Sequence, residues 1–358
     1  MSNIINDYDK NKRKYESFAK SLRSLISSLL LAEKINTHSV SFRIKERDSL
    51  EGKINSKGTY SCIDDITDIV GLRVITHFAD EVDAIAKLIE REFIIDEENT
   101  IDKRKALEPD RFGYLSLHYI ISISDKRKDL FEYSLYDGLK AEVQIRSILQ
   151  HTWAEIEHDI GYKSSKDVPR FIKRQFSRLA GLLELADEEF ISIRESLSDY
   201  TKEVNNNMLA DMHNSLTIDK ITLREFLKKS SLISNIVDEI KIKVGDVLDV
   251  ESDYHGAAIN SLHCMGVFSI GELEKYFEEY KHEVANRVAW VVNKVPVSFK
   301  NNRPYEILAL YLAQIIAFSR GGEEGITYLF ENTGVLLNGT EVSEFCEGLA
   351  EAINSSKN

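Results

Sequence analysis

An acid, an amide and a guanidinium alternate with apolar side chains in the segment AEVQIRS, residues 141–147. Successive side chains of a β-strand point to opposite faces, so Glu142, Gln144 and Arg146 share one face while the residues between them face a core. Such a polar row is unusual on so apolar a strand, because a buried polar group without a partner costs free energy. It suits a site that holds a metal ion and a phosphate. The segment therefore predicts one strand of an active site.

A predicted helix follows this strand directly and carries further polar residues. His151, Glu155 and His158 recur there at helical spacing. They lack the HExxH order of a zinc peptidase. The pair His158–Asp159 also occurs in HD phosphohydrolases, but such a site needs more histidines and carboxylates across a large helical domain. The sequence contains no Walker A loop, GxGxxG or GxSxG. A hydrolase is therefore not expected.

A second carboxylate, Asp68, lies in the apolar segment 65–78, which its β-branched residues predict to be a buried strand. Two interpretations of Asp68 and Glu142 stay open. Each could pair with a nearby arginine, such as Arg73 or Arg146. Alternatively, the two could share Mg²⁺, which prefers one or two carboxylates plus substrate phosphates. Two acids on neighbouring strands suit nucleotidyl or phosphoryl transfer.

The segment RFGYLSLHYI, residues 111–120, is predicted to be a loop and a strand. Tyr114, Ser116 and His118 share one face of that strand. An aromatic ring at the mouth of a strand could stack on a base, with the hydroxyl and the imidazole touching phosphate. A structural tyrosine is the commoner case, so both interpretations are kept.

Basic residues gather in the segment FRIKERDSLEGK, which includes Arg43, Lys45 and Lys53. One interpretation is a solvated basic face. The other is a cradle for a polyphosphate, in which an arginine can also stack on a base.

Composition indicates a globular, cytoplasmic protein. The chain has 358 residues, of which 43% are hydrophobic and 29% charged, which is enough for two domains. No apolar run approaches the roughly 18 residues of a membrane span, and the polar N-terminus has no signal-peptide core. Three cysteines without CxxC spacing argue against a disulfide framework or a structural zinc site. The net charge of −13 disfavours non-specific nucleic-acid binding but allows a local phosphate site.

Hydrophobic periodicity predicts an α/β domain with a mixed sheet flanked by helices, followed by a mainly helical domain. The pattern lapses near 203–215, which is a predicted linker, and one β-like piece is expected at 288–299. The predicted divisions are an N-terminal helix at 1–38, the α/β domain at 39–202, the linker at 203–215 and the helical domain at 216–358, with a long helix over 169–200.

Taken together and in order, five segments resemble the synthetase domain of the RelA/SpoT family of alarmone synthetases. They are RIKERDSLEGK, DITDIVGLRVI, GYLSLHY, AEVQIRS and the helix HTWAEIEHDIGYK, and they cover roughly residues 40–165. The resemblance implies a nucleotidyltransferase-like fold. It also implies Mg²⁺-dependent transfer of the β,γ-pyrophosphate of ATP to a ribose 3′-hydroxyl.

The resemblance also implies a role for each matching residue. Asp68 and Glu142 would be magnesium ligands, and Glu142 would help to activate the hydroxyl. Arg43 and Arg73 would sandwich the adenine of ATP, with Lys45 and Lys53 near its phosphates. On the acceptor side, Tyr114 would stack on the base, Lys103 would reach the phosphates, and His118, Gln144 and Arg146 would line the site.

The chain departs from the family next to Tyr114. Housekeeping members of the family usually have asparagine and lysine where this chain has Phe112 and Asp110, although Arg111 could replace the lost charge. A carboxylate in place of a cation weakens binding of a 5′-polyphosphate by repulsion. The identity of the acceptor therefore stays open.

Three functions remain as alternatives. The first is a small synthetase that uses GDP or GTP and makes (p)ppGpp. The second is a toxin that pyrophosphorylates the 3′ CCA end of tRNA, with the C-terminal domain as a fused antitoxin or phage sensor. The third is an inactive nucleotide-sensing module, against which the presence of both carboxylates argues. A homo-oligomer and a protein trigger or ligand of the C-terminal domain are further expected partners. The tRNA hypothesis is favoured by a basic run of Arg170, Lys173, Arg174 and Arg178.

Overall fold

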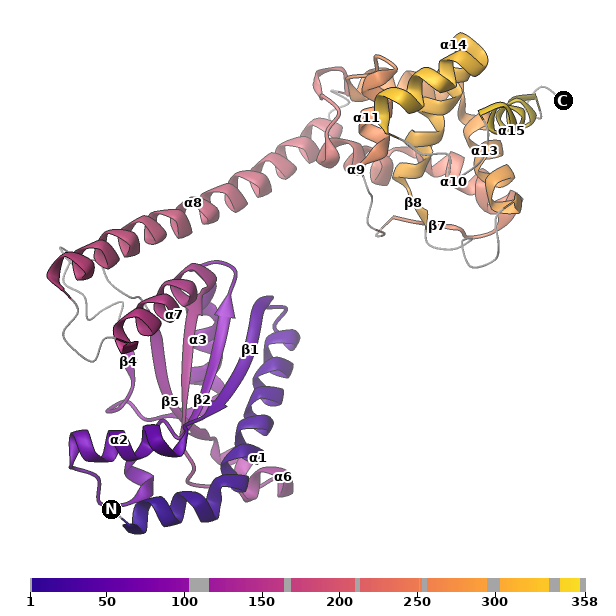
Figure 1. Cartoon of the computed structure of the whole chain (residues 1–358). Coiled ribbons are helices and arrows are strands. Elements are labelled where there is room, and N and C mark those ends of the chain that lie inside the picture. Colours follow the sequence, from indigo (N-terminus) through magenta and orange to yellow (C-terminus); the bar gives the residue numbers. More distant parts are fainter. Residues whose placement is uncertain are drawn as a thin grey trace. The chain divides into compact units, whose positions relative to one another are not determined.

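The computed structural model describes residues 2–102, 116–163, 169–209, 213–250, 252, 256–294, 303–334 and 342–354. The chain divides into two compact units, Met1–Glu195 and Ser196–Asn358 (Figure 1). Each unit has its own hydrophobic core. The predicted domain boundaries after residues 38, 202 and 215 stay predictions. No helix in the described part of the chain is long and apolar enough to cross a membrane.

A mixed sheet forms the centre of the N-terminal unit, as the sequence predicts. Its six strands run in the order β1-β2-β6-β5-β3, and β4 pairs with β5. β2 and β6 are parallel, and the other pairs are antiparallel. The strands are β1 (Thr37–Ile44), β2 (Val70–Thr76), β3 (Phe93–Ile95), β4 (Ile101–Asp102), β5 (Leu117–Ile123) and β6 (Ala141–Ser147).

Helices bury the apolar face of this sheet. In α1, Phe18, Leu22 and Ile26 recur at helical spacing and are fully buried. They share a core with the alternate apolar residues of the strands, such as Val143 and Ile145 of β6. The helices of this unit are α1 (Ser2–Ala32), α2 (Arg47–Lys57), α3 (Glu81–Glu92), α5 (Asp125–Lys128), α6 (Phe131–Ser134), α7 (Ile148–Lys163) and the first part of α8 (Arg170–Leu209). The polar face of the same strands is left for the site.

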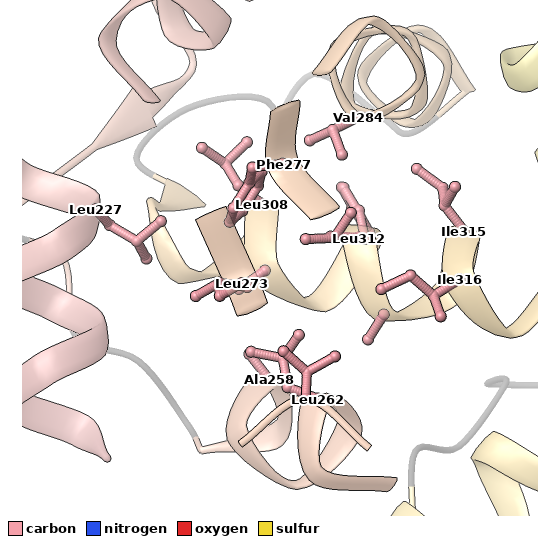
Figure 2. Packing of buried hydrophobic residues seen from close by; sticks show 14 of the residues in the cluster. Leu227, Ala258, Leu262, Leu273, Phe277, Val284, Leu308, Leu312, Ile315 and Ile316 are labelled. Carbon is pink, nitrogen blue, oxygen red and sulfur yellow. The ribbon is translucent and has the colours of Figure 1, made fainter. Parts of the chain in front are cut away.

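The C-terminal unit is mainly helical, as expected. Its core is built from aliphatic and aromatic side chains of several helices, among them Leu273, Phe277 and Leu312 (Figure 2). Two short strands, β7 (Leu248–Asp249) and β8 (Arg303–Pro304), pair in parallel. The helices are α9 (Lys220–Lys229), α10 (Ser231–Val244), α11 (Ala257–Cys264), α12 (Ile270–Glu279), α13 (Lys281–Lys294), α14 (Glu306–Thr333) and α15 (Val342–Asn354).

The β-like piece predicted at 288–299 is wrong over its described part, because residues up to Lys294 belong to α13. Val284, Val288 and Val292 are spaced four apart and are buried in the C-terminal core, so one helical face outweighs the β propensity of valine. Residues 295–299 lie outside the described part.

Helix α8 ends nine residues beyond its expected end at Tyr200 and so runs into the predicted linker. Val204 and Met208 are spaced four apart there, and both are buried in the C-terminal core. Their burial stabilises the helix across a polar stretch that contains three consecutive asparagines.

Candidate functional site

The polar row of β6 is a chain of hydrogen bonds. Gln144 Nε2 donates to Glu142 Oε2 at 2.9 Å, and Arg146 Nη2 donates to Gln144 Oε1 at 2.6 Å. On the other side, His118 Nδ1 lies 2.9 Å from Glu142 Oε1. Antiparallel pairing of β5 with β6 places His118 directly opposite Gln144, which brings the imidazole to the carboxylate. The predicted shared face is therefore confirmed.

Asp68 lies in a turn before β2 and not within a strand, so its predicted placement is wrong. Its carboxylate is held by two ammonium groups: Lys45 Nζ is 2.9 Å from Oδ2, and Lys53 Nζ is 2.8 Å from Oδ1. Lys45 follows β1, and Lys53 lies in α2. The expected pairing of this carboxylate with Arg73 or Arg146 is thus replaced by pairing with the two predicted phosphate-binding lysines.

Backbone contacts fix this cluster in place. The N–H of Lys45 donates to the carbonyl of Ile69 at 2.9 Å, which extends the pairing of β1 and β2 by one residue, to the neighbour of Asp68. The hydroxyl of Tyr8 in α1 donates to the carbonyl of Lys45 at 2.7 Å. The position of Lys45 is therefore set by the sheet and by the N-terminal helix together.

Both carboxylates are charged at neutral pH. Burial raises the pKa of Asp68, but hydrogen bonds from Lys53 and Lys45 outweigh it and the net pKa is lowered. Burial likewise raises the pKa of Glu142, and the contact with His118 followed by the one with Gln144 lowers it overall. The negative charge of Asp68 is a further contribution that raises the pKa of Glu142. The two carboxylates therefore lie near enough to repel each other.

A pocket of about 460 Å³ opens on the polar face. From the sheet it is lined by Arg43, Arg73, His118, Gln144 and Arg146, and from α7 by Trp153, Ala154, Glu155, Glu157 and His158. Three guanidinium groups of the sheet and two carboxylates of α7 thus line a space of nucleotide size.

Gly71 gives Arg43 its place beside this pocket. Arg43 of β1 is paired with Gly71 of β2, which in turn is paired with Glu142 of β6. A Cβ atom on Gly71 would lie 3.3 Å from Cγ and 3.4 Å from Nε of Arg43. The missing side chain therefore leaves room for the arginine to cross the strand.

Helix α7 closes the pocket by an ion pair. Arg73 Nη1 lies 3.1 Å from Glu155 Oε1, and His151 Nδ1 lies 3.9 Å from the same oxygen. The pKa of His151 is lowered, first by burial and then by the charge of Arg146, so the imidazole favours its neutral form. Any anion that uses Arg73 must share it with Glu155.

Two contacts of α8 hold α7 and the end of β6. Trp153 Nε1 donates to the carbonyl of Phe176 at 3.2 Å, and the two rings meet edge to face. Ser147 Oγ donates to Asp187 Oδ2 at 2.7 Å. Asp187 is almost fully buried, and burial raises its pKa although the bond from Ser147 opposes the shift.

The donor set fits a magnesium ion only in part. Two neighbouring carboxylates are the oxygen ligands that Mg²⁺ prefers, with phosphates and water completing its shell. Both oxygens of Asp68 contact lysines, however. The two ammonium groups must therefore move from Asp68 to a phosphate before the carboxylate can bind a cation. Within the described residues there is no group of three or more His, Cys, Asp or Glu side chains able to hold a metal.

The structure brings most of the predicted site residues together. Arg43, Arg73, His118, Gln144 and Arg146 line the pocket, and Lys45, Lys53 and Asp68 form a cluster. Glu142 makes a hydrogen bond to the pocket residue His118, and the charge of Asp68 contributes to raising its pKa. The predicted acceptor-binding residues Lys103 and Tyr114 lie outside the described part of the chain.

Sequence reasoning missed the pocket wall formed by α7. The sequence indicates helical spacing for Glu155, and for His158 that spacing and its pair with Asp159. It assigns no role to Trp153, to Glu157 or to Asp187, the partner of Ser147. The signal lay in the order of the elements, because a helix that follows the polar strand directly must pass over its end.

Residues 42–167 match a family described as "Region found in RelA / SpoT proteins". GTP pyrophosphokinase YwaC of Bacillus subtilis is 29% identical over 159 residues, which are 43% of this chain and 72% of that protein. GTP pyrophosphokinase YjbM of the same organism is 28% identical over 141 residues, which are 38% of this chain and 62% of that protein. The crystal structure of small alarmone synthetase 1 from Bacillus subtilis covers 54% of this chain and 99% of its own, at 22% identity and a TM-score of 0.46.

Proposed function

We propose that this chain, a member of the RelA/SpoT family, transfers the β,γ-pyrophosphate of ATP to the 3′-hydroxyl of GDP or GTP. The chain is a pyrophosphotransferase, like the two GTP pyrophosphokinases that it resembles. The nucleotides and the role of each residue are the proposal.

One observation carries the assignment of the site. The charged pair Asp68 and Glu142 connects two cationic regions: the lysines that hold Asp68, and the pocket in which Arg43 and Arg73 lie. Pyrophosphoryl transfer needs this arrangement, because its transition state spreads negative charge over phosphate oxygens and the reactants must be aligned.

ATP, the donor, would contact the cationic residues of both regions. The guanidinium groups of Arg43 and Arg73 can stack on the adenine, and Lys45 and Lys53 can exchange Asp68 for ATP phosphates. Released from the lysines, Asp68 would join Glu142 as a ligand of Mg²⁺. The ion, when bound, neutralises charge on the transferred group.

The acceptor hydroxyl would lie against Glu142. A carboxylate with a lowered pKa is ionised at neutral pH, so it accepts a hydrogen bond from the 3′-hydroxyl and orients the oxygen. His118 contacts the same carboxylate and could take part in receiving the proton. Gln144 and Arg146 keep Glu142 in position through their hydrogen bonds.

A transfer assay tests the proposal. The full chain is incubated with Mg²⁺ and γ-labelled ATP, and in parallel with GDP, GTP, AMP, ADP or deacylated tRNA. Label in guanosine nucleotides is expected. Asp68→Asn and Glu142→Gln should each reduce the rate by about 10²–10³-fold, because each removes charge stabilisation at the reacting group. Asp129→Asn is the matched control, since Asp129 is an exposed carboxylate outside the site.

The other acceptors decide between the alternatives. Arg170, Arg174 and Arg178 of α8 are exposed and could contact a nucleic-acid backbone. Label in tRNA would show that the acceptor is the 3′ CCA end of tRNA and not a guanosine nucleotide. No transfer to any acceptor, with nucleotide binding intact, would reject the enzyme and support the nucleotide-sensing module. A role of the C-terminal unit as a fused antitoxin or phage sensor is likewise a proposal.

A further inference from the structure

A fully buried arginine, Arg287 of α13, lies in the core of the C-terminal unit. Only 2% of its surface is exposed. Its guanidinium carbon lies 4.6 Å from the ring centre of Phe345, 4.9 Å from that of Trp290 and 5.8 Å from that of Tyr311. The three rings come from α15, α13 and α14, so the charge is enclosed between helices. Cation–π contacts of this kind offset part of the cost of burying it.

The positive charge of Arg287 has no counter-charge among the residues that the structure describes. Its Nε and Nη1 atoms are enclosed and have no hydrogen-bond partner there. Burial lowers the pKa of Arg287 to about 10, although the ionised forms of Tyr311 and Cys346 would favour the cation. The guanidinium is therefore still charged at neutral pH, and an unpaired buried charge is strongly destabilising. Such a group is rare in a folded protein, and a bound anion is one explanation for it.

Neither Tyr311 nor Cys346 supplies the missing negative charge. Burial raises the pKa of the Cys346 thiol, and the charge of Glu323 raises it further, although the charge of Arg287 opposes the shift. Burial also raises the pKa of the Tyr311 hydroxyl, against the charges of Arg303 and Arg287. Both groups are therefore neutral at pH 7. Arg303 Nη1 donates to the hydroxyl oxygen of Tyr311 at 3.3 Å, which leaves the O–H proton of Tyr311 for another acceptor.

We propose that the C-terminal unit binds a small organic acid with a single carboxylate at Arg287. The carboxylate accepts hydrogen bonds from the enclosed N–H groups, and the hydroxyl of Tyr311 is a further donor. The rings of Trp290, Tyr311 and Phe345 contact the apolar body of the acid. One unpaired cation matches one carboxylate, whereas a phosphate monoester carries a charge of about −1.5 to −2 at neutral pH and would leave an excess of negative charge in an apolar core.

Helix α15 gives the acid a way to the guanidinium. Phe345 lies in its first turn, whereas two hydrogen bonds to α13 lie near its C-terminal end. Asn286 Nδ2 donates to the carbonyl of Ala352 at 3.2 Å, and Trp290 Nε1 donates to Glu351 Oε2 at 2.6 Å. Helix ends open locally at a low cost in free energy. The first turn of α15 can therefore move aside while the other end of the helix stays attached.

Binding of benzoate and butyrate tests the site, with benzamide and butyramide as their neutral matches. The full chain carries Trp153→Phe, so that Trp290 is its one remaining tryptophan and reports on the C-terminal unit. At least one of the two acids should change this fluorescence and raise the urea midpoint that it reports, increasingly with concentration above the dissociation constant. The amides should do neither. No effect of either acid, or an equal effect of its amide, of sodium chloride or of sodium phosphate at the same ionic strength, would overturn the proposal.

Arg287→Met shows whether the acid binds at this arginine. The variant replaces the buried charge by an apolar side chain, so without acid its urea midpoint should be at least that of the natural chain. Its response to the acids should be lost. Arg320→Met is the matched control, because Arg320 is an exposed arginine of α14, and it should keep the response. A response retained in Arg287→Met would contradict the assignment of the site.

Cys346→Asp tests the same point even where Arg287→Met does not fold. It adds a carboxylate at a position whose charge acts on Arg287. This internal carboxylate should raise the urea midpoint and weaken binding of the acid roughly tenfold, because both compete for the guanidinium. Cys346→Ser is the neutral control and should bind the acid as the natural chain does. Equal affinities of the two variants would reject Arg287 as the binding group.

Discussion

Glu142 is the residue at which the two parts of the site meet. It contacts His118 and Gln144 on the pocket side, and the negative charge of Asp68 contributes to raising its pKa. The two carboxylates differ in their partners, because lysines hold Asp68 and an imidazole with an amide holds Glu142. Lysines can leave for a phosphate, whereas the hydrogen bonds of Glu142 are built into neighbouring strands. Asp68 is therefore the more adaptable of the two.

The lowered pKa of Glu142 predicts a pH effect on stability. Because its folded pKa lies below the ordinary 4.5, ionised Glu142 stabilises the fold above that pH, and this contribution is lost as the pH falls through the folded value. Glu142→Gln has no ionisable group at this position, so its stability does not contain this pH-dependent contribution. Urea midpoints of the natural chain should therefore fall more steeply below about pH 4.5 than those of the variant. Parallel curves would show that Glu142 is not held as described.

Gly71→Ala is expected to disturb Arg43. The new methyl group would lie 3.3 Å from its Cγ, so the flexible side chain must shift by a few tenths of an ångström beside the pocket. We expect KM for ATP to rise several-fold, with a change in stability within about 1 kcal/mol. Gly52→Ala is the control, because nothing lies within 4 Å of its added Cβ. Steady-state kinetics measure both, and an unchanged KM in Gly71→Ala would remove Arg43 from the donor site.

At the scale of elements, the junction of β6 with α7 and α8 positions the pocket wall. Ser147 ends β6 and donates to Asp187, and Trp153 of α7 donates to the backbone of α8. Both bonds join segments that are distant in sequence, so no local pattern predicts them. They explain why α7 can present Glu155 to Arg73 with little freedom.

Asp187 gives a prediction for this junction. Burial raises its pKa, so the fold favours the neutral carboxyl, and that stabilisation is lost as the pH rises through the folded value. At pH 7, Asp187→Asn keeps an acceptor for Ser147 without a buried charge and should be at least as stable as the natural chain. Asp187→Ala removes the acceptor of the Ser147 O–H, while the bond from the Gln150 N–H to the same hydroxyl remains, and should be less stable than Asp187→Asn by about 1–3 kcal/mol. Urea unfolding measures both, and equal stabilities would contradict the role given to the bond.

At the scale of the whole molecule, two cores predict two unfolding events. The chain has two tryptophans, Trp153 in the N-terminal unit and Trp290 in the C-terminal one. Phe277 is fully buried in the C-terminal core beside Phe226, so Phe277→Ala should cost about 3–5 kcal/mol there. Two-state behaviour is not expected of such a chain.

Single-tryptophan variants separate the two events. In a Trp153→Phe background, the fluorescence of Trp290 should report a lowered urea midpoint when Phe277→Ala is added. In a Trp290→Phe background, the midpoint reported by Trp153 should change much less. Equal shifts at both tryptophans would mean that the units unfold as one.

The sequence by itself determined the mixed sheet, the polar row of β6 and the likeness to the RelA/SpoT family, because period-two alternation and ordered motifs are local properties. It also named Lys45, Lys53, Arg43 and Arg73 from their motifs. A prediction from local propensity was wrong where burial against distant elements decides the secondary structure. At Val288, burial of one helical face in the C-terminal core outweighs the β propensity of valine. Only the tertiary structure showed that lysines hold Asp68, that Glu155 of α7 holds Arg73 and that aromatic rings of α14 and α15 enclose Arg287. Each of these depends on elements meeting across the fold, which spacing along the chain does not encode.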